Sequence, residues 1–347
     1  MYHNKLIELI NNNIDDLSWY ELSINPNIPE EFFEQHIDLV NWKQLSSNPH
    51  IREAFFERHI DLVNWEQLSS NTNISEAFYE RHIDLVKWKQ LSGNTNISDE
   101  FFERHIDHVN WYWLSSNTNI SEEFFERHID HVDWYVLSSN TNISDEFFEQ
   151  HINKVKSWKW LSKNTNISEE FFERHIERVN WYGLSRNTNI SDAFFERHID
   201  HVYWAELSIN TNISEAFFER HIERVNWGML SMNTNISEAF LLRHIDRVNW
   251  HYLSYNKKIS GAFFDSNIDK PLSWLHISGS PNLSIEFFIK HRDKINWCAF
   301  SFNRMPRYRY MRLTREFKQE LAAKAYAPTK PMGKLDRASV AGYFSTL

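Results

Sequence analysis

The chain has 347 residues and a mass of 41.9 kDa, and 16% of its residues are aromatic, whereas it contains 7 Gly, 8 Pro and 1 Cys. These counts disfavour a many-turned β-sandwich and exclude a disulfide framework or a Cys-rich metal site. The formal net charge of −10 disfavours a general nucleic-acid-binding protein. No apolar stretch approaches the roughly 18 residues of a membrane helix, and no signal-type apolar core opens the chain. We therefore expect a cytoplasmic or other intracellular protein that is neither secreted nor membrane-bound.

Most of the sequence consists of one internal repeat marked by tryptophan. The series comprises Trp19, Trp42, Trp65, Trp88, Trp111, Trp134, Trp158, Trp181, Trp204, Trp227, Trp250, Trp274 and Trp297. Successive members are 23 residues apart, or 24 at two steps. We therefore expect one array of thirteen repeats over residues 1–303, followed by a different segment over 304–347, in place of the two or three globular domains typical of this length.

Each repeat contains the pattern of an α-helix, for example in residues 73–94. Either Asn73 caps this helix in a capping box with Glu76, or Ser75 is the N-cap and the acidic residue lies in the first turn. One apolar and aromatic stripe follows, formed by Phe78, Tyr79, His82, Ile83 and Val86. Its spacing predicts a helix of about three turns.

A second, shorter helix is expected to begin at each repeat tryptophan. The preceding residue is Asn, Asp or Ser, the preferred N-caps, in eleven of the thirteen repeats, and Lys87 and Tyr203 are the exceptions. Trp65 and Leu68 are spaced i, i+3 on a helix of about one and a half turns, either α or 3₁₀. Because no repeat buries its aromatic face alone, the pattern predicts an all-α, superhelical solenoid of two-helix repeats with a C-terminal helix and arm.

The repeat also resembles known repeat families. Its stretch L-S-x-N-T-N-I-S-x-x-F-F is similar to the A-x-N-P-N-x-P-x-x-L-L core of leucine-rich-variant repeats, which Asn-Pro-Asn-Ile-Pro at residues 25–29 matches most closely. The fuller pattern W-x-x-L-S-x-N-x-N-I-S-x-x-F-F resembles tandem-repeat proteins of giant DNA viruses. The resemblance covers about 300 of the 347 residues and implies a right-handed superhelix of alternating 3₁₀ and α-helices, but no activity.

Histidine and asparagine recur at fixed positions of the repeat. Same-site histidines on adjacent helices would lie about 8–10 Å apart, which is too far to share a zinc ion at ligand distances of about 2 Å. We therefore expect no metal site, but an internal ladder in which each imidazole bonds a neighbouring turn or carboxylate. The histidines are His36, His59, His82, His105, His128, His151, His175, His198, His221, His244 and His291. A structural asparagine ladder is expected from Asn48, Asn71, Asn94, Asn117, Asn140, Asn164, Asn187 and Asn210.

No motif of an enzyme is present. The sequence lacks G-x-G-x-x-G, G-x-x-x-x-G-K-[ST] and G-x-S-x-G, and its only thiol, Cys298, has no recognisable catalytic partner. Catalysis needs a unique constellation of side chains, which near-identical repeats do not provide. We therefore expect no catalytic residue, no cofactor and no enzymatic activity.

Positions that vary between the repeats are the candidates for recognition, because scaffold positions repeat. The two residues after each repeat tryptophan vary most, and in the middle repeats they include Tyr112, Trp113, Tyr135, Trp160 and Tyr182. Exposed Trp and Tyr are typical hot spots of protein interfaces. The alternative interpretation is that these rings fill gaps between short helices. These five residues are the candidate partner-binding site.

One edge of the array is predicted to become basic along the chain. The position two before the N-cap of the second helix begins as Leu39, Leu62 and Leu85 and later becomes His, Lys or Arg, as in Arg224 and Arg247. Recurrence of cationic side chains at one position of a stacked repeat would place them on one edge.

The C-terminal segment differs in charge from the repeats. Residues 304–347 carry ten Lys or Arg and three Asp or Glu, a net charge of +7, so that residues 1–303 carry −17. Tyrosines are interleaved with the arginines of this basic arm, which are Arg304, Arg307, Arg309, Arg312 and Arg315. Three alternatives are that the arm caps the last repeat, docks on the acidic body of another copy or of a partner, or binds nucleic acid.

Together these patterns predict a non-enzymatic scaffold that presents an extended acidic surface to another protein. The basic arm would be a second contact or a means of self-association. A structural component of a giant-virus particle or assembly lattice is the alternative function, and a nucleic-acid-binding adaptor acting through residues 304–347 is the third.

Overall fold

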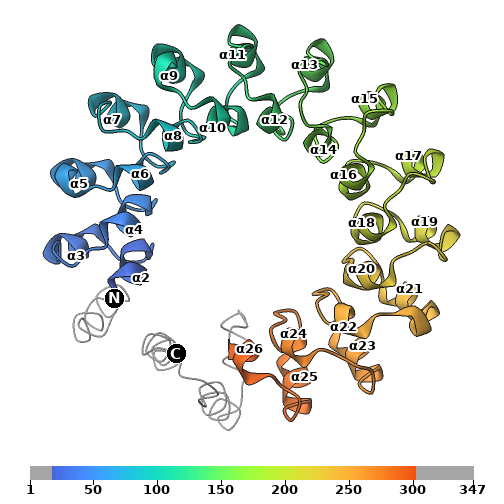
Figure 1. Cartoon of the computed structure of the whole chain (residues 1–347). Coiled ribbons are helices and arrows are strands. Elements are labelled where there is room, and N and C mark those ends of the chain that lie inside the picture. Colours follow the sequence, from blue (N-terminus) through green and yellow to red (C-terminus); the bar gives the residue numbers. More distant parts are fainter. Residues whose placement is uncertain (1–17, 302–347) are drawn as a thin grey trace. The chain divides into compact units, whose positions relative to one another are not determined.

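The computed structural model describes residues 18–301. Within this range every regular element is a helix, and two series of short helices alternate along the chain (Figure 1). We call them the Trp helices, which begin at the repeat tryptophans, and the Phe helices, which carry the paired phenylalanines. The 23-residue repeat is therefore a two-helix repeat, as predicted. The predicted boundary between residues 303 and 304 lies outside the described range.

The helices have the following bounds. The Trp helices are α2 (Trp19–Ile24), α4 (Trp42–Ser47), α6 (Trp65–Leu68), α8 (Trp88–Leu91), α10 (Trp111–Ser116), α12 (Trp134–Leu137), α14 (Trp158–Leu161), α16 (Trp181–Arg186), α18 (Trp204–Ile209), α20 (Trp227–Met232), α22 (Trp250–Leu253), α24 (Trp274–Ser278) and α26 (Trp297–Ser301). The Phe helices are α3 (Glu30–Gln35), α5 (Glu53–Arg58), α7 (Glu76–Arg81), α9 (Asp99–Arg104), α11 (Glu122–Arg127), α13 (Asp145–Gln150), α15 (Glu169–Arg174), α17 (Asp192–Arg197), α19 (Glu215–Arg220), α21 (Glu238–Arg243), α23 (Gly261–Ser266) and α25 (Ile285–Lys290). Three 3₁₀ segments follow Phe helices, namely η2 (Ile60–Leu62), η3 (Ile106–His108) and η4 (Ile245–Arg247).

Serine, not asparagine, caps the Phe helices from α7 onward, whereas α3 and α5 have Pro29 and Arg52 at the N-cap and no side-chain cap. Ser75 has extended backbone angles and its hydroxyl accepts a hydrogen bond from the backbone N–H of Phe78 at 3.3 Å. The carboxylate of Glu76 does not reach back to Asn73. It accepts a hydrogen bond from the backbone N–H of Ser98, the N-cap of the next repeat. The capping-box alternative is therefore wrong, and the first-turn acid links neighbouring repeats instead.

The Phe helices are shorter than the three turns predicted from the stripe. Helix α7 has six residues and ends before His82, whose φ of −120° and ψ of 33° are not helical. The imidazole ring packs against Phe78 and Trp65, with centroid distances of 4.9 and 5.7 Å. The first part of the apolar stripe lies on the helix and the second part, which begins at His82, lies in a non-helical turn. The ring contacts of His82, not helix geometry, hold it against the same core.

The Trp helices begin as predicted and are α-helical. The side chain of Asn64 accepts a hydrogen bond from the backbone N–H of Gln67 at 3.0 Å, whereas the exceptions Lys87 and Tyr203 make no such cap. Helix α6 spans four residues, and its Leu68 is fully buried. The 3₁₀ helix occurs after the Phe helix rather than in the second helix.

The asparagine ladder connects each repeat to the one before it. The side-chain amide of Asn117 donates to the backbone carbonyls of Ser92 and Asn94, both at 3.1 Å, and its oxygen accepts from the backbone N–H of Asn119 at 3.0 Å. Asn117 is 2% exposed. Equivalent bonds recur in the described members of the series, so the interpretation as a structural ladder is confirmed.

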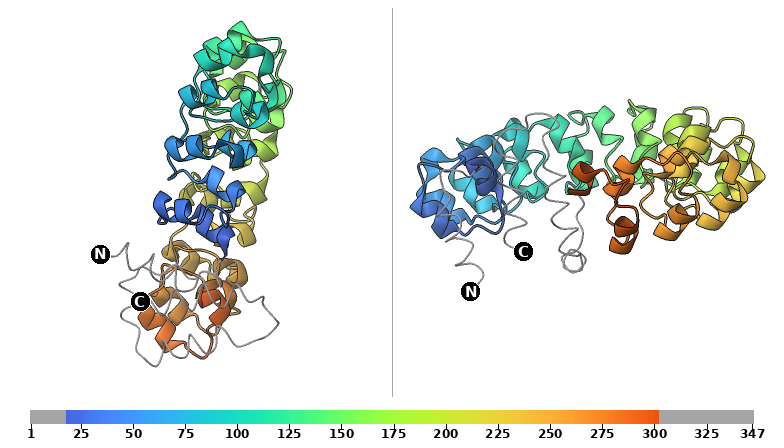
Figure 2. Two further views of the ribbon diagram at one scale, coloured as in Figure 1. Left: turned by 90° about the vertical axis from the view of Figure 1, so that its left-hand side faces the viewer. Right: turned by 90° about the horizontal axis from the view of Figure 1, so that it is seen from below.

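The described residues divide into two compact bodies, the first ending at Asn166 and the second beginning at Ile167. In each body the closest helix contacts join successive Trp helices, such as α4 with α6 and α18 with α20. The Trp helices therefore lie on the inner side of the curve of each body and the Phe helices on the outer side (Figure 1). Figure 2 shows the helices of both bodies in two further views, with the first body in blue to green and the second in yellow-green to orange.

Candidate functional site

The structure places four of the five candidate residues on successive Trp helices of the first body. Tyr112 and Trp113 lie on α10, Tyr135 on α12 and Trp160 on α14. Their exposed fractions are 53%, 40%, 53% and 36%. We call these four residues the aromatic patch. They face solvent and are not buried in gaps between helices.

The fifth candidate, Tyr182, belongs to the second body. It lies on α16, is half-buried, and meets the exposed ring of Tyr203 edge to face at a centroid distance of 5.8 Å. Each body is described by itself, so Tyr182 is not assigned to the aromatic patch.

The register of the Trp helix directs the patch outward. Trp111 packs on Phe124 of the following Phe helix at a centroid distance of 6.2 Å, and Leu114 is fully buried. Because a helix turns about 100° per residue, the two positions between these anchors face away from the core. The N-cap Asn110 holds the start of α10 by accepting from the backbone N–H of Trp113 at 3.2 Å.

Lysines lie against the exposed indoles. The ammonium of Lys89 is 6.0 Å from the centre of the Trp113 ring, and that of Lys163 is 5.0 Å from the centre of the Trp160 ring. Tyr112 meets Trp113 edge to face at 5.6 Å. Such cation–π and edge-to-face contacts stabilise ring orientations by about 0.5–1 kcal/mol each at exposed sites. The patch is therefore a partly ordered surface before any partner binds.

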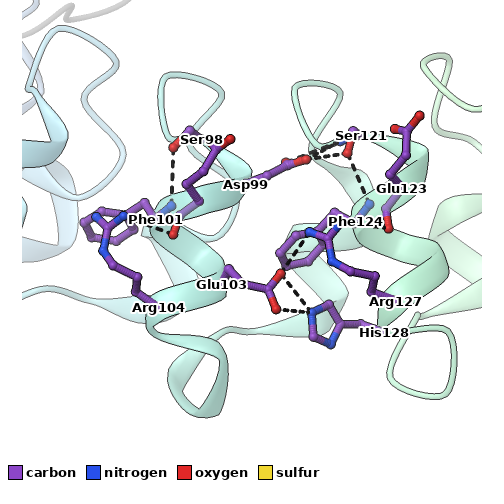
Figure 3. A network of polar contacts seen from close by, with 11 residues as sticks. Ser98, Asp99, Phe101, Glu103, Arg104, Ser121, Glu123, Phe124, Arg127 and His128 are labelled. Carbon is purple, nitrogen blue, oxygen red and sulfur yellow. Dashed lines mark hydrogen bonds and ion pairs between the residues drawn. The ribbon is translucent and has the colours of Figure 1, made fainter.

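The histidines form the ladder that their spacing predicted, except that the buried Nε2 of His36 in the first described repeat has no hydrogen-bond partner. Figure 3 shows one step, in which the carboxylate of Glu103 accepts hydrogen bonds from Arg127 at 3.0 Å and from the imidazole Nε2 of His128 at 3.1 Å. The His128 ring also packs on Phe124 at 4.8 Å. Among residues 18–301 no group of three or more His, Cys, Asp or Glu side chains is arranged to hold a metal ion.

The ladder makes the fold sensitive to acid. Hydrogen bonds from Arg127 and His128 hold the pKa of Glu103 below its ordinary value of 4.5, and Arg81 and His82 lower the pKa of Glu57 in the same way. A carboxylate whose folded-state pKa is depressed stabilises the fold above its unfolded pKa, and this stabilisation is lost as the pH falls through the folded pKa.

We therefore predict that the melting temperature falls as the pH is lowered from about 5 to about 3, through the pKa of these carboxylates. A variant that combines Glu57→Gln, Glu80→Gln and Glu103→Gln should melt lower than the wild type at neutral pH and lose less on acidification. Thermal unfolding followed by circular dichroism measures both changes. The exposed Glu123→Gln is the matched control, and equal acid sensitivity of the wild type and the triple variant would refute the prediction.

The edge that becomes basic along the chain is paired with acidic residues. Arg224 lies over Trp204 at 5.1 Å and 3.5 Å from Asp200 of the preceding repeat. Arg247 is 2.6 Å from Glu223 in the same way. These cations balance the carboxylates beside them and do not form a separate basic surface.

A second group of exposed aromatic and apolar residues, which was not among the predicted site residues, lies in the second body. Its members are on α22, in the turn after α22 and on α24. Tyr252, Tyr255 and Leu275 are 38%, 41% and 52% exposed. Tyr255 stacks on His276 at 3.6 Å, and burial together with the neighbouring His251 lowers the pKa of His276. Tyr252 and Leu275 lie at the variable positions after Trp250 and Trp274, as the patch residues do after theirs, whereas Tyr255 lies in the turn that follows α22. The sequence signal of the aromatic patch is therefore present in these later repeats too.

Repetition of one two-helix repeat through residues 18–301 defines the class of protein, an α-helical tandem-repeat solenoid. Comparison with models of protein families, with curated proteins and with solved structures finds no match. No helix in the described range is long and apolar enough to cross a membrane. The predicted basic arm, with Arg304, Arg307, Arg309, Arg312 and Arg315, lies outside the described residues.

Proposed function

We propose that the protein is a non-enzymatic scaffold that binds another protein through the aromatic patch. The supporting observation is that large aromatic side chains are exposed on three successive Trp helices of one body. At the same positions the second, third and fourth repeats carry polar residues, for example Lys43 and Gln44. The scaffold therefore does not require aromatic residues there.

Interface energetics favour this assignment. Trp and Tyr supply much of the binding energy of protein interfaces, and a single hot-spot residue contributes about 2 kcal/mol or more. The recurring Asn, Glu and His side chains are engaged in bonds between repeats, as Asn117, Glu103 and His128 are. The variable positions after each repeat tryptophan are thus the ones available for recognition.

The absence of enzymatic activity is part of the proposal. The histidines and carboxylates that commonly perform catalysis occur here as equivalent pairs in repeat after repeat, for example His59 with Glu34 and His221 with Glu196. A His–Glu pair that recurs in repeat after repeat is explained by the stacking of the repeats on one another and does not require a catalytic role.

The aromatic patch is tested by partner capture with a matched control. We expect a variant with Tyr112→Ala, Trp113→Ala and Trp160→Ala to lose the proteins that the wild-type chain captures by more than about tenfold. The control is Tyr20→Ala on α2, because Tyr20 directly follows a repeat tryptophan, as Tyr112 does, and is equally exposed at 53%. Quantitative mass spectrometry of proteins captured by equal amounts of folded bait measures the change. Unaltered capture by the triple variant would reject this function.

Two alternative functions rest on other features. The resemblance of the repeat to proteins of giant DNA viruses favours a structural component of a particle or assembly lattice. Detection of this chain in purified particles at a fixed copy number would support that function.

The basic arm favours a nucleic-acid-binding adaptor. Binding of RNA or DNA that is steeply salt-dependent and is lost on removal of residues 304–347 would support this function.

A further inference from the structure

Around the aromatic patch the acidic residues lie off the Trp helices, whereas α2 and α6, which carry no patch residue, contain Glu21 and Glu66. Exposed carboxylates occur in the first turn of the Phe helices, for example Glu100, Glu123 and Glu146. The Trp helices α8, α10, α12 and α14 contain no Asp or Glu. The nearest carboxylate in sequence is the N-cap Asp133, which accepts hydrogen bonds from the backbone N–H groups of Tyr135 and Val136 at 3.0 and 3.1 Å.

Three lysines border the aromatic patch. Lys89 on α8 and Lys159 on α14 are exposed, and Lys163 lies in the turn directly after α14. Lys89 and Lys163 hold their ammonium groups against Trp113 and Trp160. The next Trp helix toward the N-terminus, α6, carries an acidic residue instead of a lysine. This residue, Glu66, accepts a hydrogen bond from the side chain of Gln90 on α8 at 3.0 Å. The patch is therefore an apolar and cationic surface on a chain whose repeats are acidic.

We infer that the aromatic patch and its three lysines bind an extended acidic segment of a partner protein. Apolar side chains of that segment contact the rings, and its carboxylates pair with the lysine ammonium groups. Charge complementarity selects this occupant, because a cationic rim steers an anionic partner and disfavours a cationic one. The inference rests on the proposed function and specifies its partner.

A peptide fits this surface better than a single-stranded nucleic acid does. Stacked bases need open aromatic faces, whereas lysines already lie over Trp113 and Trp160 and Tyr112 meets Trp113 edge to face. A nucleic acid also carries a charge on every nucleotide. A peptide can place its carboxylates at the lysines only.

The repeat spacing suggests the probe. Packed helices lie about 8–10 Å apart, and an extended polyproline-II chain advances about 9 Å in three residues. A 12-residue peptide of four Glu-Glu-Phe triplets can therefore offer one apolar side chain to each successive Trp helix. The comparison peptides are four Lys-Lys-Phe triplets, four Glu-Glu-Ser triplets and a scrambled Glu/Phe sequence.

Fluorescence anisotropy with the full-length chain tests the inference. We expect the Glu-Glu-Phe peptide to bind at least about tenfold more tightly than each comparison peptide and to weaken as salt is raised. Lys89→Gln combined with Lys159→Gln should weaken binding about tenfold, and Lys→Arg at both sites should restore it. Lys43→Gln, in the same register on α4, is the control that leaves binding unchanged.

The outcomes separate this inference from the proposed function. We call the variant with Tyr112→Ala, Trp113→Ala and Trp160→Ala the patch variant. If it loses the captured partners but the Glu-Glu-Phe peptide binds the wild-type chain no better than the Lys-Lys-Phe peptide does, the inferred acidic partner is wrong and the proposed scaffold function stands. If capture survives in the patch variant, the function itself fails. Tighter, patch-dependent binding of oligothymidylate would overturn the inference in favour of a nucleic acid. Patch-dependent self-association in sedimentation would overturn it in favour of a second copy.

Discussion

Replacing Asn117 by alanine is expected to lower the free energy of unfolding by about 2–4 kcal/mol, because the change removes three hydrogen bonds between backbone and side chain. Two of them go to backbone carbonyls and one comes from a backbone N–H, and only the carbonyl of Asn94 keeps another donor, the N–H of Ile97. The carbonyls belong to Ser92 and Asn94 of the preceding repeat, whereas the N–H belongs to Asn119. The substitution therefore weakens the interface between repeats. In a repeat array, stability is a sum of repeat and interface terms, so the unfolding transition should also broaden or split. Urea unfolding followed by tryptophan fluorescence measures both effects.

Two further variants isolate the cause. The exposed Thr118→Ala, one residue away, should leave the free energy of unfolding unchanged within about 0.5 kcal/mol. Asn117→Asp keeps the acceptor for Asn119 but loses the amide donor and buries a charge against two carbonyls, so it should destabilise at least as much as alanine. A loss below about 1 kcal/mol for Asn117→Ala would show that the asparagine ladder does not hold the repeats together.

Replacing Phe124 by alanine is expected to cost about 3–5 kcal/mol through loss of buried surface and creation of a cavity. The ring is fully buried and lies between Trp111, Phe125 and His128, at centroid distances of 6.2, 6.2 and 4.8 Å. The contacts to Phe125 and His128 lie within one repeat and the contact to Trp111 joins it to the preceding Trp helix, so the change weakens both the repeat and its packing on the helix before it. Chemical denaturation measures the free energy of unfolding, and fluorescence of the nearby tryptophan reports on local packing.

Phe124→Leu distinguishes volume from aromatic geometry. Leucine retains much of the volume, and its cost should stay below about 2 kcal/mol. Equal losses for leucine and alanine would mean that ring contacts to Trp111 and His128, not filled volume, hold the repeat core.

Local sequence rules predicted the existence and type of the elements because their signals lie within a few residues. The tryptophan period, the serine or asparagine before each helix and the apolar stripe led to an all-α two-helix repeat. The same local rules failed for Glu76 and His82. Glu76 bonds Ser98 of the next repeat, and His82 leaves the helix to contact Glu57 of the preceding one. Partners more than twenty residues away are outside the range of capping and periodicity rules.

Variation inside the chain contained information that could have identified these partners. Leu242 stands where other repeats have the ladder glutamate, and in the following repeat Ser266 and Asn267 replace the usual Arg and His. Asn267 turns back and donates to the carbonyl of Phe263 at 2.9 Å. Such paired replacements indicate contact between repeats, since loss of the acceptor coincides with loss of both donors.

Four of the five candidate residues are exposed, whereas Tyr182 is half-buried, and the sequence alone left exposure and the filling of gaps as alternatives. Exposure of Tyr112, Trp113, Tyr135 and Trp160 follows from their register beside a buried Trp or Leu. The local charge around these four residues could not be predicted from the net charge of −17 over residues 1–303. A net charge does not say which side of the array carries the acidic residues and which carries the lysines. The structure places Glu100, Glu123 and Glu146 on the Phe helices and the lysines beside the patch.

Site-specific photo-crosslinking tests most directly whether the aromatic patch is the contact surface. A photoreactive phenylalanine analogue is placed at Tyr135 on α12, or at the exposed Glu123 on α11 as the control, in a chain made at its natural level in its own cells. We predict that position 135 crosslinks to the same partner that the wild-type chain captures, and that position 123 does not. Crosslinks to that partner at position 123 but not at position 135 would contradict the account.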